Sequence, residues 1–148
     1  MEAHVVSQRW QEILENTLQP KLQEVERERE AHKRAAGEYA DLVVLIGALR
    51  VQRDQSTGGA MPLEAHCEVV PGSGVFEPVE VPDATRIHVD VGEGKYEEFT
   101  LDVALAQAQQ RQEHFERLAR ECQTQVDKIQ RDIWKGMSVV EQLKKVGE

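Results

Sequence analysis

Aromatic residues are scarce in this chain. Phe, Trp and Tyr make up only 5% of the 148 residues, while charged residues make up 30%. This composition argues against a large single core and is typical of long helices that pair along a narrow seam. The length is sufficient for one domain.

Cysteine and long apolar runs are also scarce. The two cysteines, Cys67 and Cys122, lie far apart in the sequence, which argues against a disulfide scaffold and favours a reducing compartment. No apolar run is long enough to cross a membrane, and the first residues lack the basic and apolar leader of a secretory signal. We therefore expect a cytoplasmic and nuclear protein with no membrane partner.

Positive charge is nearly missing from the middle of the chain. Residues 54–100 contain ten acidic and two basic residues, whereas residues 1–53 contain nine and eight, and residues 101–148 contain eight of each. An acidic segment repels the phosphates of nucleic acids. We therefore expect no direct binding of DNA or RNA.

The motifs that enzymes need are absent as well. The Gly72-Ser73-Gly74 segment lacks the third glycine and the following helix of a dinucleotide loop, and the Gly92–Lys95 segment lacks the spacing of a phosphate loop. The histidines lie on separate predicted elements, without metal-ligand spacing to either cysteine. We expect no catalytic residue, no metal and no cofactor. The histidines are His4, His32, His66, His88 and His114.

What the chain does contain, from about residue 2 to 53, is an apolar pattern with helical spacing. Pro20 interrupts it, and a proline inside a helix costs about 3 kcal/mol because it lacks a backbone N–H. We favour a kinked but nearly continuous helix; the alternative is a short helix that ends near Leu18 and a second helix with Pro20 in its first turn. The apolar positions are Val6, Trp10, Ile13, Leu14, Leu18, Leu22 and Val25, then Tyr39, Leu42, Leu45, Ile46 and Leu49.

The segment from 63 to 100 predicts four strands in two β-hairpins. Apolar and polar residues alternate in Leu63–Val70, in Arg86–Val91 and in the returning strand at Lys95–Thr100. The run Val75–Val81 contains Pro78, which fits only an edge or bulged strand. Pro71–Gly74 and Gly92–Gly94 have the composition of tight turns.

These two hairpins cannot bury their own apolar face, and they leave open strand edges. Such edges usually pair with another subunit, so the sequence predicts an oligomer. The residues that we expect to pack and pair between subunits are Val69, Val75, Val79, Ile87, Val89, Val91, Tyr96 and Phe99.

A second helical arm is predicted over about 101–146, with Thr100 as its N-cap. Its apolar residues step by three and four without a break, which is a heptad seam. We expect Cys122 to be a small buried residue of this seam. The seam residues are Phe115, Ala119, Cys122, Val126, Ile129, Ile133, Gly136, Val140 and Leu143.

The predicted fold is therefore α+β: a long antiparallel coiled-coil hairpin of two helices with two β-hairpins (four strands) at its base. We predict a single domain over residues 1–148. Its parts are a helical arm at about 2–53, a β body at about 63–100 and a second arm at about 101–146.

One segment of the β body, Val81-Pro82-Asp83-Ala84-Thr85-Arg86-Ile87-His88-Val89, resembles the α-type prefoldin subunits. Gly92, Gly94, Phe99–Leu101 and Ala104-Leu105 extend the resemblance, which covers about residues 9–112. Within this family the segment is most similar to the unconventional, UXT-type subunits. Pro20, a longer loop at 54–62 and a more polar first arm depart from the pattern.

The resemblance implies a hetero-hexamer with β-type and other α-type prefoldin-like subunits, in which the hairpins form a joined barrel base. It also implies a non-catalytic co-chaperone that holds or delivers unfolded client proteins. UXT-type subunits work with the R2TP co-chaperone and support protein complex assembly. The alternatives are a standard prefoldin α subunit that delivers actin and tubulin to the chaperonin, and a coiled-coil adaptor or transcription cofactor that binds no client.

On this interpretation the arm tips would contact clients. Both tryptophans lie there, and the tips have more apolar residues than one seam needs. The alternative is that these side chains only pack against one another. The tip residues are Val5, Val6, Trp10, Ile13, Trp134, Met137, Val139, Val140, Leu143 and Val146.

Overall fold

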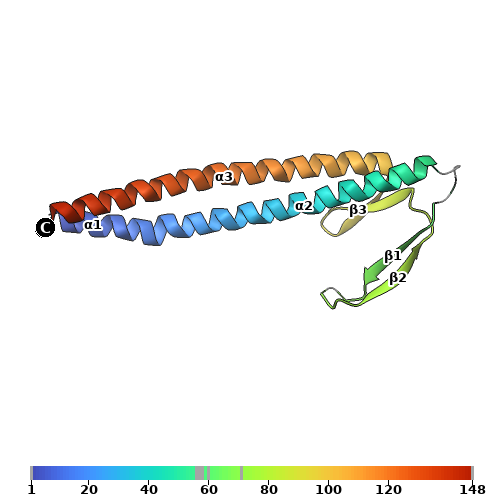
Figure 1. Cartoon of the computed structure of the whole chain (residues 1–148), viewed down its shortest axis with the longest axis horizontal. Coiled ribbons are helices and arrows are strands. Elements are labelled where there is room, and N and C mark those ends of the chain that lie inside the picture. Colours follow the sequence, from blue (N-terminus) through green and yellow to red (C-terminus); the bar gives the residue numbers. More distant parts are fainter. Residues whose placement is uncertain (1, 56–58, 60, 71, 148) are drawn as a thin grey trace. The chain divides into compact units, whose positions relative to one another are not determined.

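A computed structural model of the chain describes residues 2–55, 59, 61–70 and 72–147 (Figure 1). The chain is α+β, with long helices and antiparallel strands. Its contacts group into two compact units. The helical unit comprises Met1–Gly37 and Glu113–Glu148, and the strand unit comprises Glu38–Gln112. Each unit is described by itself below.

The first arm consists of three consecutive helical elements: α1 (Glu2–Ile13), a π-helical turn η1 (Leu14–Leu18) and α2 (Gln19–Gln55). In η1 the backbone N–H of Gln19 donates to the carbonyl oxygen of Leu14, five residues earlier. Pro20 follows directly and has no N–H to donate. The prediction of a nearly continuous helix through Pro20 is confirmed, because α1, η1 and α2 follow one another without a gap. The helix is irregular only at η1, the π-helical turn before Pro20.

The π turn changes which residues of α1 are buried. A π turn holds one more residue than an α-helical turn, so every inward position before it moves by one residue. Ser7 and Leu14 are buried, whereas Val6 and Ile13 are 43% and 42% exposed. Val6 and Ile13, which the spacing placed in the apolar pattern of the first arm, therefore lie outside the buried seam. Leu45, another residue of that apolar pattern, is exposed beside the fully buried Ile46.

The second arm is α3, Leu101–Val146. The backbone N–H of Val103 donates to Thr100 Oγ1 at 3.4 Å, which confirms Thr100 as the N-cap. All nine predicted seam residues of α3, from Phe115 to Leu143, are buried or half-buried. The buried pattern also extends back through Leu101, Ala104 and Ala108. These three residues were not part of the predicted seam.

The two arms run antiparallel within each unit. In the helical unit, Arg29 Nη1 donates to Gln123 Oε1 at 2.8 Å, and Val25 packs against Cys122 and Val126. In the strand unit, Arg50 Nε lies 2.8 Å from Asp102 Oδ1. This ion pair is partly exposed, so we expect it to contribute at most about 1 kcal/mol.

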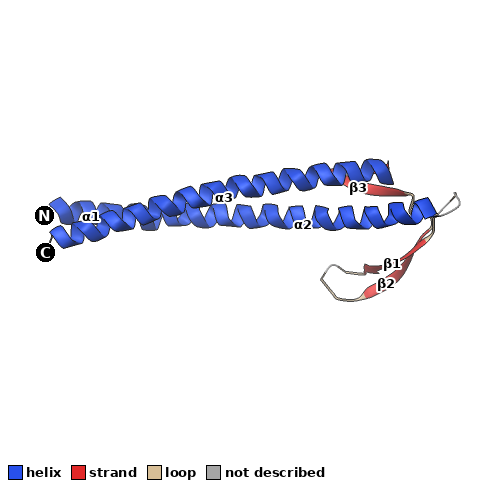
Figure 2. Cartoon of the chain, turned by 45° about the horizontal axis from the view of Figure 1, so that its top comes forward, coloured by secondary structure: helices blue, strands red, loops and turns tan. Residues whose placement is uncertain are grey.

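The described strands of the strand unit form two antiparallel pairs, of which β1 and β2 are seen side by side in Figure 2. Strand β1 (Leu63–Glu68) pairs with β2 (Phe76–Val81), and β3 (Arg86–Gly92) pairs with β4 (Lys95–Thr100). Glu93 and Gly94 form the β3–β4 turn with φ values of 55° and 71°, as a two-residue hairpin turn with right-handed strand twist requires.

The core of the strand unit joins both helices to the strands. Its buried residues come from α2, from the loop before β1, from the turn before β3 and from α3. Half-buried side chains of β3 and β4 pack against it. The buried set is Ile46, Leu49, Met61, Ala84, Leu101, Ala104 and Ala108, and the strand residues include Ile87, Val89 and Phe99.

The outer half of the β1–β2 hairpin does not reach this core. Alternation in β1 predicted a half-buried strand from Leu63 to Val69. Leu63 and Ala65 are half-buried as predicted, but Cys67 and Val69 are exposed. Only the root of the hairpin, at Leu63 and Val81, packs against the core. The prediction therefore fails for the outer residues because nothing in the strand unit covers them.

The carboxylate of Asp83 closes the root of this hairpin. Asp83 Oδ1 accepts hydrogen bonds from the backbone N–H groups of Met61 and Thr85, at 3.1 and 3.0 Å. Asp83 Oδ2 accepts one from the Thr85 hydroxyl at 2.9 Å, and the N–H of Ala84 donates to the carbonyl of Met61. These bonds, first those of the Met61 and Thr85 amides, hold the pKa of Asp83 below its ordinary value.

This arrangement predicts a pH-dependent opening of the hairpin root. Because the folded-state pKa of Asp83 lies below the ordinary 3.8, the ionised carboxylate stabilises the fold above that pH. The contribution is lost as the pH falls through the lowered pKa. Hydrogen exchange of the Met61 amide, corrected for intrinsic rates, should accelerate on acidification. In Asp83→Asn this pH dependence should be much weaker, while the Val69 amide, bonded to the Val75 carbonyl, serves as the reference. An equal pH response in both proteins would contradict the assignment.

Candidate functional site

The structure divides the predicted subunit-interface residues into two groups. Ile87, Val89 and Phe99 are half-buried against the core of this chain, and Val91 is also half-buried. The others, Val69, Val75, Val79 and Tyr96, are exposed. The second group therefore offers the free apolar surface of the β body.

The β1–β2 hairpin has one mainly apolar face, interrupted by Glu77 opposite Cys67, and one mixed face, on which acidic residues lie beside Phe76 and Pro78. Opposite residues of the two strands share a face, and the face alternates along each strand. Leu63 lies opposite Val81, and Ala65 lies opposite Val79, on the apolar face. Glu64 lies opposite Glu80 on the other face. The N–H of Val69 donates to the Val75 carbonyl, so these two valines continue the apolar face beyond the strands.

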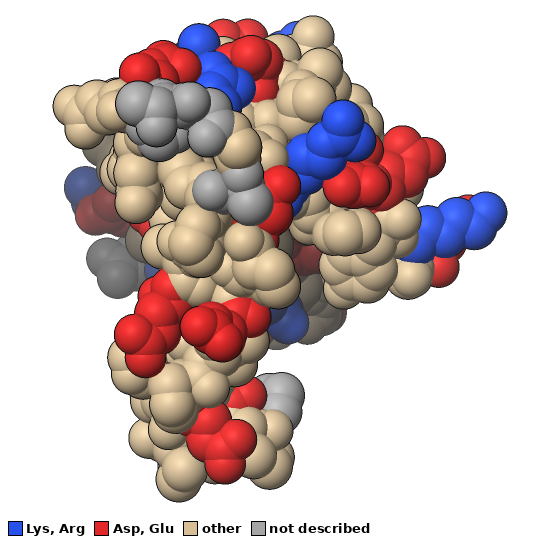
Figure 3. All heavy atoms as spheres, turned by 90° about the vertical axis from the view of Figure 1, so that its right-hand side faces the viewer, with Lys and Arg blue, Asp and Glu red and all other residues tan. Residues whose placement is uncertain are grey.

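The acidic residues of the mixed face have no balancing charge within their own segment. The sequence contains no Lys or Arg from residue 54 to 85. Figure 3 shows acidic side chains on this hairpin, which lies at the bottom of the view. Like charges directly opposite each other on a sheet destabilise the pairing. The hairpin thus combines an uncovered apolar face with a like-charged cross-strand pair, Glu64 and Glu80.

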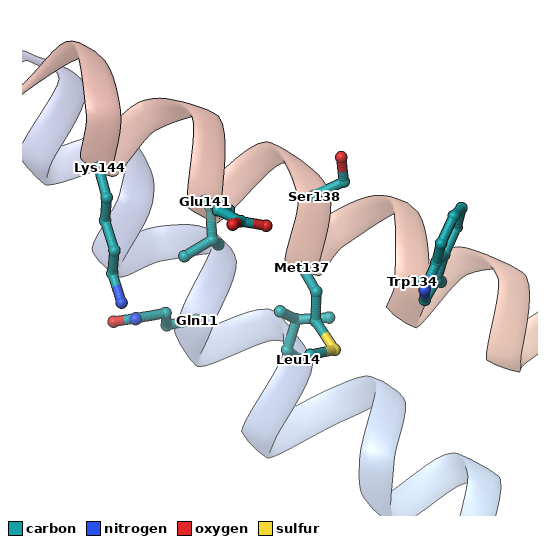
Figure 4. Close-up of a pocket in the computed structure, with 8 residues that line it drawn as sticks. Gln11, Leu14, Trp134, Met137, Ser138, Glu141 and Lys144 are labelled. Carbon is teal, nitrogen blue, oxygen red and sulfur yellow. The ribbon is translucent and has the colours of Figure 1, made fainter.

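A second candidate surface is a groove of about 470 Å³ near the end of the helical unit (Figure 4). Leu14 from η1 and Met137 from α3 point toward one another across it. Trp134 stands at one end of the groove and Lys144 at the other. The lining residues are Gln11, Leu14, Trp134, Met137, Ser138, Val140, Glu141 and Lys144.

The predicted tip residues differ in how accessible they are. Trp134 is 77% exposed, and Met137 and Val146 are also exposed. Val5, Val6 and Ile13 are exposed on α1. Trp10, Val139 and Leu143 are half-buried, and Val140 is buried. Some of the apolar residues at the tip therefore pack between the helices, and the others are exposed at the surface.

The polar rim of the groove was not predicted from the sequence. Gln11, Glu141 and Lys144 are ordinary helix-surface residues in the sequence, and no local pattern distinguishes them. They come together because α1 and α3 are antiparallel and because η1 shifts the register of α1. Leu14 was predicted only as one member of the seam.

Gly136 allows the close approach of the two arms at this groove. A Cβ atom at this position would lie 2.9 Å from Leu14 Cδ2 and 3.5 Å from Trp10 Cε3. A side chain there would displace Leu14 from the floor of the groove. The glycine was predicted as a seam position, and the structure gives its physical reason.

The two cysteines lie in different environments. Cys122 is 6% exposed and packs with Val25 and Val126, as predicted for a small buried residue. Burial, the largest cause, raises the pKa of the Cys122 thiol, and the nearby Glu28 and Glu121 carboxylates raise it further. The thiol therefore stays protonated and unreactive near neutral pH. Cys67 is exposed on the β1–β2 hairpin.

Over the described part of the chain, no group of three or more His, Cys, Asp or Glu side chains could hold a metal ion. No helix in the described ranges is both long and apolar enough to span a membrane. The strongest features of both units are exposed apolar side chains on helices or strands. Exposed apolar patches on a protein mark sites of interaction with other molecules.

Comparison with known proteins adds one match. The family model described as "Prefoldin subunit" matches residues 18–145, which include all four strands and most of both arms. No curated protein matches the chain.

The close contact at Gly136 predicts a position-dependent effect of a larger residue. Gly136→Val should lower the free energy of unfolding by about 1–3 kcal/mol, because overpacking displaces Leu14. The matched control is Gly37→Val on α2, where an added Cβ meets nothing within 4 Å. That change should be neutral or slightly stabilising, because valine is a better helix former than glycine. Denaturant unfolding of both variants measures the difference; equal effects would refute the packing argument.

Proposed function

Because the chain belongs to the prefoldin family, we propose that it is a non-catalytic co-chaperone subunit of a prefoldin-type hetero-oligomer that holds unfolded client proteins. The observation that carries the proposal is the family match over residues 18–145. It spans both arms and the strands between them. On this proposal the arms act as a coiled coil and the strands as the assembly module.

The strand unit supports assembly through its open edges. Each described sheet has two strands, so each strand has one edge that pairs with no other described strand. Two-stranded sheets are marginally stable alone. We propose that these edges pair with β-type and other α-type prefoldin-like subunits. The presence of β1–β2 as well as β3–β4 supports an α-type subunit, since α-type subunits have two hairpins.

The helical unit supports client binding through the groove at its end. A non-native client exposes apolar side chains in no fixed arrangement, so its binding surface must adapt. Met137 is flexible and polarisable, and Trp134 offers a large exposed apolar area. Capture by such a surface needs no nucleotide. Release then depends on a partner that competes for the client or receives it.

The Val81–Val89 segment favours a UXT-type subunit within the family. Its Asp83 closes the hairpin root, so the segment has a structural role that a similar subunit would share. On this proposal the chain joins an R2TP-linked prefoldin-like complex that supports protein complex assembly, and it works in the cytoplasm and nucleus. The alternative functions are those of a standard prefoldin α subunit and of a coiled-coil adaptor that binds no client.

Mass spectrometry of the intact complex, captured by a tag on this chain from native extract, tests the assembly. We expect β-type prefoldin subunits together with an unconventional α-type partner and AAA+ ATPases. The ordinary prefoldin set with the chaperonin would replace the UXT-type proposal by the standard one. Recovery of the chain with no prefoldin-type subunit would overturn the proposed function.

Client binding predicts a separable loss of function at the groove. Trp134→Ser combined with Met137→Ser should reduce the suppression of aggregation of a denatured protein, without nucleotide, at least several-fold. Both side chains are exposed, so the fold and the assembly should be unaffected. Trp134→Phe combined with Met137→Leu keeps the apolar surface and should retain the suppression. Unchanged suppression by the serine variant, measured on the assembled complex by light scattering, would argue for packing alone.

A further inference from the structure

The groove at the end of the helical unit contains an exposed methionine. Met137 is 56% exposed, and its side chain points toward Leu14 across the groove (Figure 4). The chain contains three methionines, and the structure describes two of them. The other described methionine, Met61, is only 5% exposed and lies in the core of the strand unit. The two thioethers therefore differ strongly in their access to solvent.

The close packing of the arms at this groove comes from the neighbours of Met137. Gly136 and Val140 are buried in the seam. An added Cβ at position 136 would meet Leu14 Cδ2 at 2.9 Å, which shows how tightly the two helices meet there. Met137 lies outside this seam. A chemical change at its sulfur atom therefore alters the lining of the groove and leaves the seam contacts in place.

A solvent-exposed thioether is open to oxidation by peroxides. With hydrogen peroxide, the sulfur atom attacks one peroxide oxygen; an S–O bond forms, the O–O bond breaks, and the second oxygen leaves as water. The sulfur loses two electrons and the peroxide gains them, so the atoms and electrons balance. The reaction needs no deprotonation of the side chain. Burial withholds the same chemistry from Met61, where a polar product would disrupt the core.

The sulfoxide changes the character of the groove. Oxidation turns a flexible apolar side chain into a polar one. The new S–O group stands among the apolar lining residues Leu14, Trp134 and Val140. An apolar client segment that enters the groove must then remove water from this oxygen without replacing its hydrogen bonds, which is unfavourable. Oxidation should therefore weaken the hold of the groove on a client.

We propose that Met137 is a reversible oxidation site that controls client binding at the groove. The reduced thioether binds the client, and the sulfoxide releases it. A methionine sulfoxide reductase reverses the change: two thiols become a disulfide, and the sulfoxide oxygen leaves as water. The exposure of Met137 makes it accessible to such an enzyme. This inference rests on the client binding of the proposed function and adds its regulation.

The first measurement identifies the oxidised residue. The full-length chain in its assembled complex carries Cys67→Ser, which removes the exposed thiol. The complex is treated with hydrogen peroxide for increasing times, and peptide mass spectrometry follows both described methionines. We expect Met137 to be oxidised at least tenfold faster than Met61. A rate at Met137 no greater than the rate at Met61 would overturn the inference.

The second measurement tests whether oxidation acts through this residue. After the peroxide is removed, light scattering reports how well the complex suppresses the aggregation of a denatured protein, and each complex is compared with its own untreated form. We expect the complex with Met137 to lose at least half of its suppression, and the complex with Met137→Leu to lose much less. The partner subunits are the same in both complexes, so the difference reports Met137. A methionine sulfoxide reductase with dithiothreitol should restore the lost suppression.

Met61→Leu is the matched control, because it removes the other described thioether with a similar side-chain volume. Its complex should respond to peroxide as strongly as the complex with both methionines. Equal losses with Met137→Leu and with Met137 would overturn the inference and leave the proposed client binding standing. Absence of suppression by every untreated complex would instead overturn the proposed client binding, and the inference with it.

Discussion

The stripe of small and apolar residues along α3 is the constraint on which both units depend. Leu101, Ala104 and Ala108 close the core of the strand unit, and Cys122 and Val126 hold the arms of the helical unit together. The same three-and-four spacing serves both purposes. Because the arms meet along one narrow line, little apolar area is buried per residue, and a small aromatic content is sufficient. The exposed apolar side chains of both units lie outside this line.

The fold was largely predictable where the pattern is long and unbroken. The buried pattern of α3 repeats over many turns, so its spacing alone predicted the seam from Phe115 to Leu143. The buried positions of the first arm were harder to predict because η1 adds one residue to a helical turn, and no residue type in the sequence indicates such an insertion. Val6 and Ile13 are four and three residues from Trp10, so local spacing alone placed them in the apolar pattern, although both are exposed. An unbroken α-helical register counted back from Val25 would turn the polar residues Glu15, Gln11 and Gln8 inward. The π turn instead brings Leu14 and Ser7 inward.

The candidate groove was predictable only in part. The excess of apolar residues at the tips, including Trp134 and Met137, is visible in the sequence. The residues that complete the groove are not, because Gln11 and Lys144 become neighbours only through antiparallel pairing in one register. The hairpin shows the opposite case. The alternation of β1 correctly predicted Leu63 and Ala65 as half-buried, but alternation does not show how far along the strand the core reaches, and Cys67 and Val69 are exposed.

The hydrogen bonds of Asp83 have a consequence for how such a chain can change in length. Met61 and Asp83 lie in direct contact although 22 positions separate them in the sequence. The chain therefore enters and leaves the β1–β2 hairpin at a single point, and only the root of the hairpin, at Leu63 and Val81, packs against the core. One in-frame deletion or insertion between Met61 and Asp83 would therefore remove or add the whole β1–β2 hairpin with its exposed apolar side chains.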